Sequence, residues 1–189
     1  MGNKVEFGLK NVHYAVATED AEGVITYDTP KRIRGAVELS VEPRGDMTEF
    51  YADDVLYYSS SNNNGYDGTV TIARIPQEFA VDVLGDELDE ASGVVTERSN
   101  AKQKKFALLF EFDGDENATR QVLYYCSASR PSVTSQTKTE TTEPNTNELT
   151  FIASPRPSDY KVKTKTADTV VEEVYNAWYD QVFELPEGA

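Results

Sequence analysis

Apolar and polar residues alternate along most of this chain, a pattern typical of β-strands that bury one face. Residues 35–43 are the cleanest example, because Val37, Leu39 and Val41 alternate with polar side chains. The same period of two marks further segments, at residues 11–19, 68–75, 105–112, 120–132 and 148–154. Residues 47–58 are also predicted to be extended, with a bulge or turn at Asp53 and Asp54. The chain is therefore predicted to be mainly β.

Two neighbouring segments are predicted to form a central hairpin. The first places on one face Phe106, Leu108, Phe110 and Phe112, with Leu109 and Glu111 on the other. The second is expected to place on one face Val122, Tyr124, Cys126 and Ala128, with Leu123 and Tyr125 on the other. Residues 113–119 between them are rich in Asp, Asn and Gly, which favour tight turns. Apolar residues on both faces indicate strands in the middle of a sheet.

Two segments change to the helical period of 3.6 residues. Residues 76–85 begin with Pro76, which suits the first position of a helix, and end with Gly85, a common helix terminator. Residues 169–183 begin with Thr169 and a Glu three residues later, the spacing of a capping box. Their helical stripe is expected to be Val171, Tyr175, Trp178 and Val182. Both helices are predicted to pack on the core.

Three polar stretches stand apart from these elements. Residues 59–68 (SSSNNNGYDG) and residues 85–103 are predicted to be long loops, and such loops in a compact domain are usually functional or disordered. Residues 134–144 are rich in Thr, which favours extended backbone, yet they have no apolar face. They suit a strand that pairs with a neighbour or lines a wet channel, or a solvated loop. No linker divides residues 1–189, so a single domain is expected.

Charge narrows the choice of partners. The chain has 33 Asp and Glu residues against 18 Lys and Arg, a formal net charge of −15. This balance disfavours nucleic-acid binding by phosphate neutralisation and docking on anionic membranes. It leaves open a protein that lies close to DNA without adhering to it. The longest apolar runs are too short to span a bilayer, so no membrane partner is expected.

Residues that usually carry catalysis are sparse. His13, the one histidine, falls on the polar face of a predicted strand, and Cys126, the one cysteine, falls on an apolar face. Asp113, Asp115 and Asn117 have the spacing that opens a calcium loop, but the sixth position lacks the required glycine. No catalytic, metal-binding or cofactor-binding residue is predicted, and no cofactor. The pattern favours an assembly subunit.

Three long segments occur in a fixed order before an end that contains Trp178: FGLKNVHYAVAT, EFYADDVLYYSSSNNNGYDGTVTIARIPQEFAVDVLG and KFALLFEFDGDENATRQVLYYCSASRPS. This ordered set resembles the major tail protein, or tail tube protein, of long-tailed bacteriophages of Gram-positive hosts. The resemblance covers the chain from about Asn3 to Pro186. The whole set carries it, since no short motif within it is diagnostic.

The resemblance implies a fold and an assembly. The fold is expected to be a β-sandwich or barrel-like sheet with one or two flanking helices, similar to the tube protein of type VI secretion. Six subunits are expected to form a ring, and stacked rings a tail tube that conducts DNA into the host. The implied partners are other copies of the chain and the tape measure, tail tip and tail terminator proteins. The implied location is the virion tail, after assembly in the host cytoplasm.

With this resemblance the polar stretches gain roles. The two loops, 59–68 and 85–103, are expected to contact other subunits or rings through Asn62, Asn63, Asn64, Tyr66, Asp89 and Glu90. A lumen or partner strand is expected at Thr137, Thr139, Glu140 and Thr141. Lumen-facing strands should carry Glu, Asp, Ser and Thr, because an acidic lumen repels phosphate. The helix around Phe79 is expected on the outer side of the sheet.

Two other functions stay open. One is a virion-associated β-sandwich module that recognises a host surface glycan through exposed aromatic residues, such as the tyrosines of YYSSSNNNGY. Glycan binding by a stable monomer would favour it. The other is a carboxylate-pair hydrolase, whose activity would be lost on Asp53→Asn or Asp54→Asn.

Overall fold

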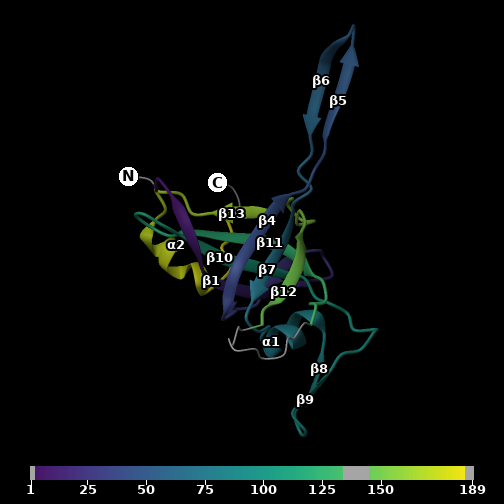
Figure 1. Cartoon of the computed structure of the whole chain (residues 1–189), viewed down its shortest axis with the longest axis vertical. Helices are drawn as coiled ribbons and strands as arrows, with labels where there is room; N and C mark the ends of the chain where they lie inside the picture. The colour runs from purple at the N-terminus through teal and green to yellow at the C-terminus, as the bar shows by residue number, and fades with distance from the viewer. Residues whose placement is uncertain (1–2, 134–144, 186–189) are drawn as a thin grey trace, which may run out of the picture.

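The computed structural model describes residues 3–133 and 145–185, and one large antiparallel sheet dominates it (Figure 1). Hydrogen-bonded strands follow the order β2-β1-β10-β11-β12-β7-β4, with β13 beside β11 and β3 beside β1. These strands are β1 (Glu6–Glu19), β2 (Ile25–Tyr27), β3 (Lys31–Arg32), β4 (Ala36–Pro43), β7 (Tyr66–Ile72), β10 (Phe106–Gly114), β11 (Thr119–Ala128), β12 (Asn147–Ala153) and β13 (Lys163–Lys165). The prediction of a mainly β protein is confirmed.

Two separate hairpins and two short helical segments complete the fold. The hairpins are β5 (Met47–Ala52) with β6 (Val55–Ser61), and β8 (Glu87–Asp89) with β9 (Val94–Thr96). The helical segments are α1 (Gln77–Phe79) with the π-helical turn η1 (Ala80–Leu84), and α2 (Glu172–Asn176) with the 3₁₀ turn η2 (Ala177–Tyr179). Figure 1 places β5–β6 at one end of the molecule, and α1 and β8–β9 toward the other.

The sheet curls around the main core. Strand β4, at one end of the order, contacts β1 near the other end. Strand β11 pairs with β13 through residues 121–123 and with β12 through residues 126–128, so the sheet turns at this point. The enclosed side chains come from five strands and include Tyr14, Val70, Phe106, Leu123, Leu149 and Phe151. The expectation of a barrel-like sheet with flanking helices is confirmed.

The helix around Phe79 belongs to this enclosed core. Phe79 meets Tyr14 and Phe106 edge-on, with ring centroids 5.0 and 5.5 Å away. Gly85 ends the helix with a φ of +84°, as predicted, whereas Pro76 is the residue before the first turn. Within the subunit the helix therefore lies on the enclosed face of the sheet, not on its outer face, because Phe79 fills the core between strands.

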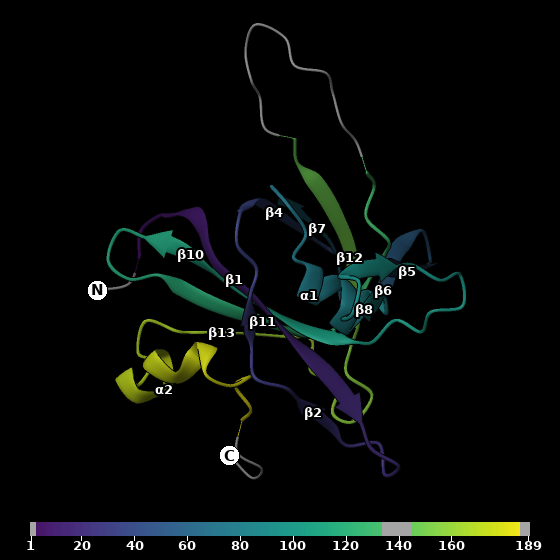
Figure 2. The same cartoon turned by 90° about the horizontal axis from the view of Figure 1, so that it is seen from below.

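The C-terminal helix α2 covers the outer face of β1, β10 and β11 instead (Figure 2). Trp178 is 2% exposed and stacks on Phe183 with ring centroids 5.5 Å apart. Beneath them lies a second cluster of strand residues, Ala15, Ala107, Leu109, Val122 and Tyr124. The predicted capping box does not form, since Val171 takes the N-cap position without a side-chain hydrogen bond.

A buried ion pair fastens α2 and η2 to the sheet. Glu111 of β10 accepts hydrogen bonds from Arg120 Nε at 3.1 Å and from the Tyr179 hydroxyl at 3.0 Å. The Asn11 side chain donates a further bond to Glu111 at 2.7 Å. The Arg120 guanidinium lies 3.7 Å from the centroid of the Tyr175 ring. Both charges are thus paired and hydrogen-bonded, the condition under which buried ions are tolerated.

A β-bulge in β4 changes which residues face the core. The register with β7 shifts between Ala36 and Glu38. Ala36 packs against the core as a result, and Val37 is 61% exposed instead of inward-facing as predicted. Leu39 and Val41 keep their predicted contact with the core. A bulge inserts one residue into a strand and so breaks the period of two.

A second bulge lies in β11. Leu108 pairs with Leu123, but Phe106 pairs with Cys126, so β11 has an extra residue between these pairs. Leu123 and Cys126 therefore share the main core, while Val122 and Tyr124 enter the outer cluster. The predicted single face through Val122, Tyr124 and Cys126 is wrong for this reason. The predicted hairpin of the two strands is confirmed.

Both predicted loops contain strand residues. Residues 59–61 end β6 and residues 66–68 begin β7, which leaves only residues 62–65 as the connection. Within 85–103, β8 and β9 pair as a small hairpin. Strands β8 and β9 lack a clear alternation because they bury neither face, and only a buried face imposes a period of two.

Candidate functional site

The β5–β6 hairpin, residues 47–61 (the projecting hairpin), extends away from the body of the molecule (Figure 1). Asp53 and Asp54 form its turn with φ values of +52° and +61°. Positive φ at both central residues defines a type I′ turn, which matches the twist of the flanking strands. The bulge or turn predicted at these two aspartates is therefore a turn.

Apolar side chains cover the projecting hairpin without a core beneath them. Those exposed are Met47, Phe50, Tyr51, Val55, Leu56, Tyr57 and Tyr58. Tyr57 is 74% exposed and meets Phe50 at a centroid distance of 6.5 Å. A two-stranded hairpin is marginally stable alone, and a contiguous exposed apolar patch marks an interaction surface. Of these residues only Tyr57 and Tyr58 were named from the sequence, as possible glycan contacts, although the run VLYY after a turn is a usable signal for the others.

A second surface is the outward side of β4, β7 and β12 (the polar face). Cross-strand neighbours run across it as Glu38, Thr71 and Glu148, then Ser40, Thr69 and Thr150, then Glu42, Asp67 and Ile152. None of the three strands contains Lys or Arg. All charged residues of β4, β7 and β12 are therefore Asp or Glu. Arg44, just beyond β4, approaches Asp67 with Nε 3.4 Å from Oδ1.

Strand β4 ends the hydrogen-bonded order, so its second edge pairs with no strand in the described parts of the chain. An unpaired edge offers a row of backbone donors and acceptors to another chain. The polar face therefore continues to an edge on which a further strand could add.

The predicted interface residues at 62–66 lie at the base of the projecting hairpin. The Asn63 side chain accepts a hydrogen bond from the Gly65 N–H at 3.0 Å, and Asn64 N donates to the Arg44 carbonyl at 2.9 Å. Tyr66 is half-buried against the core, with Lys163 Nζ 4.7 Å from its ring centroid. Asn62 also holds the connection at the base of the hairpin, because its N–H donates a hydrogen bond to the Asp46 carbonyl, with an N–O distance of 3.3 Å.

The other predicted site residues divide between a turn and the part of the chain not described. Asp89 orders the β8–β9 turn, because its carboxylate accepts bonds from Ala91 N at 3.1 Å and Ser92 Oγ at 2.5 Å. Those bonds hold the pKa of Asp89 below its ordinary value. Glu90 is exposed beside it. The predicted lumen or partner strand, Thr137, Thr139, Glu140 and Thr141, lies outside the described residues.

The two groups most often recruited for catalysis are engaged in packing. His13 stacks on Tyr179 at a centroid distance of 4.4 Å, and its Nδ1 lies 2.7 Å from the Asn11 carbonyl. Burial lowers the pKa of His13. Cys126 is fully buried in the main core, and burial raises the pKa of its thiol. A neutral buried thiol is a poor nucleophile.

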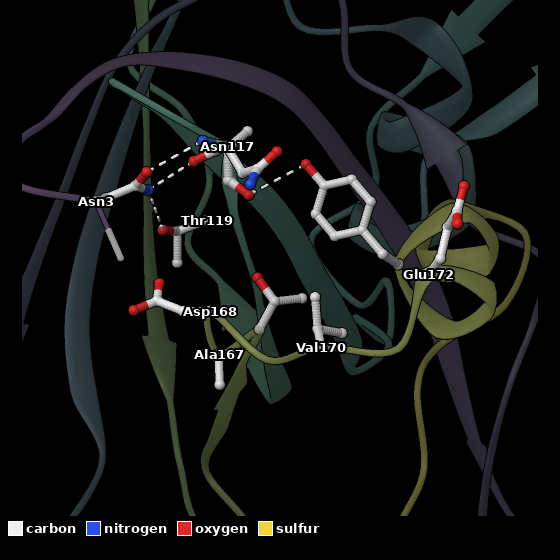
Figure 3. A pocket seen from close by; sticks show the side chains of 10 residues that line it. Asn3, Asn117, Thr119, Ala167, Asp168, Val170 and Glu172 are labelled. Atoms are coloured by element: carbon white, nitrogen blue, oxygen red, sulfur yellow. Dashed lines mark hydrogen bonds between the residues drawn. The ribbon is translucent and has the colours of Figure 1, made fainter. Parts of the chain in front are cut away.

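A pocket of about 180 Å³ lies between the N-terminal segment, the β10–β11 turn and α2 (Figure 3). Asn3 closes that turn, because its Oδ1 accepts bonds from the Glu116 and Asn117 N–H groups at 3.2 and 3.0 Å. Its Nδ2 donates to the Asn117 carbonyl at 2.6 Å. Asp168 and Glu172 also line the pocket, but no His or Cys does. The arrangement holds the β10–β11 turn in place against the N-terminal segment.

The calcium-like spacing has a structural use as well. Asp113 pairs with Lys10, and Asp115 accepts a bond from the Lys4 N–H at 2.8 Å. Within residues 3–133 and 145–185, no group of three or more His, Cys, Asp or Glu residues is placed to hold a metal ion. In the same residues, no helix is long and apolar enough to cross a membrane.

Comparison with known proteins gives one family. Residues 2–185 match the family model described as "Phage tail tube protein". No curated protein matches the chain. Among solved structures, the chain is similar to one in the "Cryo-EM Structure of an Extracellular Contractile Injection System, PVC sheath-tube complex in extended state". The two are 11% identical with a TM-score of 0.48, and the match covers 87% of this chain and 93% of that one.

The family match includes every surface described above, from the N-terminal strand to η2. The projecting hairpin and the polar face are suited to contact with other chains. The chain belongs to the phage tail tube protein family, whose members are structural components of the virion tail that associate with one another rather than enzymes.

Proposed function

We propose that this chain polymerises as stacked hexameric rings that form a phage tail tube, a conduit for DNA ejection into the host. Assembly takes place in the host cytoplasm, and the host is Gram-positive. The partners are further copies of the chain together with the tape measure, tail tip and tail terminator proteins. Ring number, DNA passage and these partners go beyond what the family alone gives.

The projecting hairpin is the observation that carries this proposal. Its exposed aromatic and aliphatic residues have no core in their own subunit, and water contact with that much apolar surface is unfavourable. A neighbouring copy that covers the hairpin would recover this free energy. The residues at its base, Asn62, Asn63, Asn64 and Tyr66, then set the angle at which it leaves the body. The β8–β9 hairpin, with Asp89 and Glu90, is the second proposed contact element.

The polar face supports the role of a conduit. In the proposed ring, β4, β7 and β12 face the lumen, and a partner strand containing Thr137, Thr139, Glu140 and Thr141 adds to the barrel. Strands that present Glu, Asp, Ser and Thr without Lys or Arg do not neutralise phosphates. DNA would pass without the counterion release that makes proteins adhere to it. A lumen formed by a basic surface instead would overturn this electrostatic account.

The test is negative-stain electron microscopy of the purified chain over a concentration series, beside sedimentation velocity. Rings or hollow tubes with a matching heavy species are expected. The decisive variant replaces residues 47–61 by Gly-Gly, which joins Asp46 to Asn62. The Asn62 N–H already lies 3.3 Å from the Asp46 carbonyl, so a short turn can close there. This variant should stay folded and monomeric.

A subtler pair of variants controls for general loss of apolar surface. Leu56→Ser with Tyr57→Ser removes two exposed side chains of the projecting hairpin. Val24→Ser with Val171→Ser removes two exposed side chains elsewhere. Only the first pair should abolish tubes. Equal assembly by both pairs would reject the hairpin as the contact element.

A glycan-binding module remains the second candidate, because the projecting hairpin exposes Phe50, Tyr51, Tyr57 and Tyr58. Aromatic rings on an open surface are able to stack on sugars. A chain that stays monomeric at every concentration, yet binds a glycan array and loses that binding on Tyr57→Ser, would favour this function over the tube.

A further inference from the structure

Three arginines line one groove beside α1 (the arginine groove), with a volume of about 810 Å³. Arg32 ends β3, Arg34 follows it in the turn before β4, and Arg74 precedes α1. Arg34 and Arg74 lie in connections that are joined by the hydrogen bond from Ala73 N to the Gly35 carbonyl, 2.8 Å long. The fold therefore brings the three cations together from separate parts of the sequence.

These arginines differ from the other five in the chain. Arg44, Arg98, Arg120, Arg130 and Arg156 each have a carboxylate partner. Across residues 3–133 and 145–185, none of the three groove arginines forms an ion pair. In a chain with a net charge of −15, acids are abundant, so chance would be expected to supply partners. A cluster left unpaired is available to an anionic partner from outside.

The groove also has an apolar floor and only a partial counter-charge. Ile75 and Val81 are half-buried in it, and Leu88 is 39% exposed at its rim. Asp82 lies in the groove but is engaged, since Lys31 Nζ is 2.6 Å and the Tyr14 hydroxyl 2.9 Å from its Oδ2. Glu78 is the remaining acid, so positive charge is in excess. The groove suits a ligand that is both acidic and apolar.

The projecting hairpin has that composition at its tip. Asp53 and Asp54 form the turn, and Val55 and Leu56 follow it at 59% and 49% exposure. The tip lies at the end of the molecule opposite α1 (Figure 1), and residues of α1 line the groove. A subunit cannot fill its own groove with a tip at its far end, so the tip must come from a second copy.

We propose that the arginine groove is the receptor for the acidic tip of the projecting hairpin of a second copy, an inference that rests on the proposed stacking function. Guanidinium groups bind carboxylates bidentately, which gives register as well as attraction. The apolar floor covers Val55 and Leu56. The contact joins two different patches, so it repeats from subunit to subunit without closing between two copies.

Two charge-removing variants test the contact in assembly. The double variant Arg34→Gln with Arg74→Gln removes two positive charges from the groove. Asp53→Asn with Asp54→Gly removes the charges of the tip and keeps the turn, because Asn-Gly is the preferred type I′ pair. Each should raise the concentration needed for assembly by about tenfold, and both together by little more than either alone, since they remove one interaction.

Cross-linking tests the contact independently of tubes. Because the one native cysteine, Cys126, is buried, a thiol reagent is expected to react with an introduced surface cysteine instead. Leu56→Cys mixed with Gln77→Cys should give a heterodimer with a bismaleimide, whereas Leu56→Cys mixed with the exposed Ser158→Cys should not. The proposed function fails if wild type forms no rings or tubes. The groove assignment alone fails if tubes form, the variants assemble like wild type and no heterodimer appears.

Binding of a polyanion is the competing use of the groove. A single-stranded oligonucleotide serves as the probe. Its binding, lost on Arg34→Gln with Arg74→Gln while assembly is unchanged, would overturn the tip contact. Absence of oligonucleotide binding, together with the heterodimer, is the expected result.

Discussion

The projecting hairpin and the C-terminal segment are both peripheral and both carry aromatic residues, but these residues are exposed in the hairpin and buried in the C-terminal segment. The C-terminal segment places Trp178 at 2% exposure over the outer cluster and is fixed by the Glu111–Arg120 pair. The projecting hairpin leaves Tyr57 at 74% exposure with nothing beneath it. One set of rings is buried within the subunit, and the other is exposed, as the proposed contact with a neighbour requires.

This difference separates apolar residues that stabilise the folded subunit from those that we propose contact a neighbouring copy. Both elements are short, so neither is stable by its own backbone hydrogen bonds. The C-terminal segment gains its order from the outer face of β1, β10 and β11. The hairpin gains little from its own subunit, and we expect its order to depend on the partner.

The largest effect should come from Trp178→Ala. Removing a buried, stacked indole leaves a cavity, and such changes cost about 3–5 kcal/mol in the free energy of unfolding. Tyr57→Ala, an exposed ring of the hairpin, should change it by less than about 0.5 kcal/mol. Urea unfolding of both monomers checks the contrast, which fails if the two losses are alike.

A carboxyl-to-amide change in β10 sharpens the comparison. Glu111→Gln leaves Arg120 as an unpaired, largely buried charge, which costs roughly 3 kcal/mol. Asp113→Asn, on the same strand but in an exposed pair with Lys10, should cost little. Thermal and urea unfolding give both values. Near-equal losses would mean that the buried pair does not anchor the C-terminal segment.

The smallest effect concerns pH. Arg156 binds both carboxylate oxygens of Asp159, at 2.8 and 2.6 Å, and holds the pKa of that carboxyl well below its usual range. A depressed pKa contributes stability above the unfolded-state pKa of about 3.9, which is lost as the pH falls through the folded-state value. Asp159→Asn should therefore destabilise at pH 6, and its difference from wild type should shrink below about pH 4.

The matched control for the pH experiment is Asp54→Asn in the hairpin turn, which has no cationic partner among the described residues. At pH 6, where Asp159→Asn should be destabilised, Asp54→Asn should unfold with nearly the free energy of wild type. A difference between wild type and Asp159→Asn that stays constant from pH 6 to the acid limit would contradict the linkage.

Periodicity predicted the long strands of the large sheet and its central hairpin, because each of these strands buries a face and buried faces impose alternation. It failed at the bulges of β4 and β11, where one inserted residue moves Val37 outward and divides Val122 from Cys126. It also could not place Phe79, since an apolar helix fits either face of a sheet. The turn at Asp53 was predictable from two adjacent aspartates.

The candidate surfaces were harder to predict than the fold. The run VLYY of the hairpin has the composition of a buried strand, and only the fold shows that it is exposed. The arginine groove joins Arg32, Arg34 and Arg74 across a gap in sequence, so no local pattern reveals it. The asparagines at 62–64, which the sequence suggested as contact residues, lie at the base of the hairpin. Their polarity indicates exposure, and their contact with another subunit stays a prediction.

The opposite placement of hairpin tip and arginine groove would give the proposed stack two unlike ends. One terminal layer presents free acidic tips, and the other presents empty grooves. Growth at either end recreates the same surface, so nothing in the subunit itself sets a final length. A protein that halts growth through this contact would present a groove to the free tips at one end, or a tip to the empty grooves at the other.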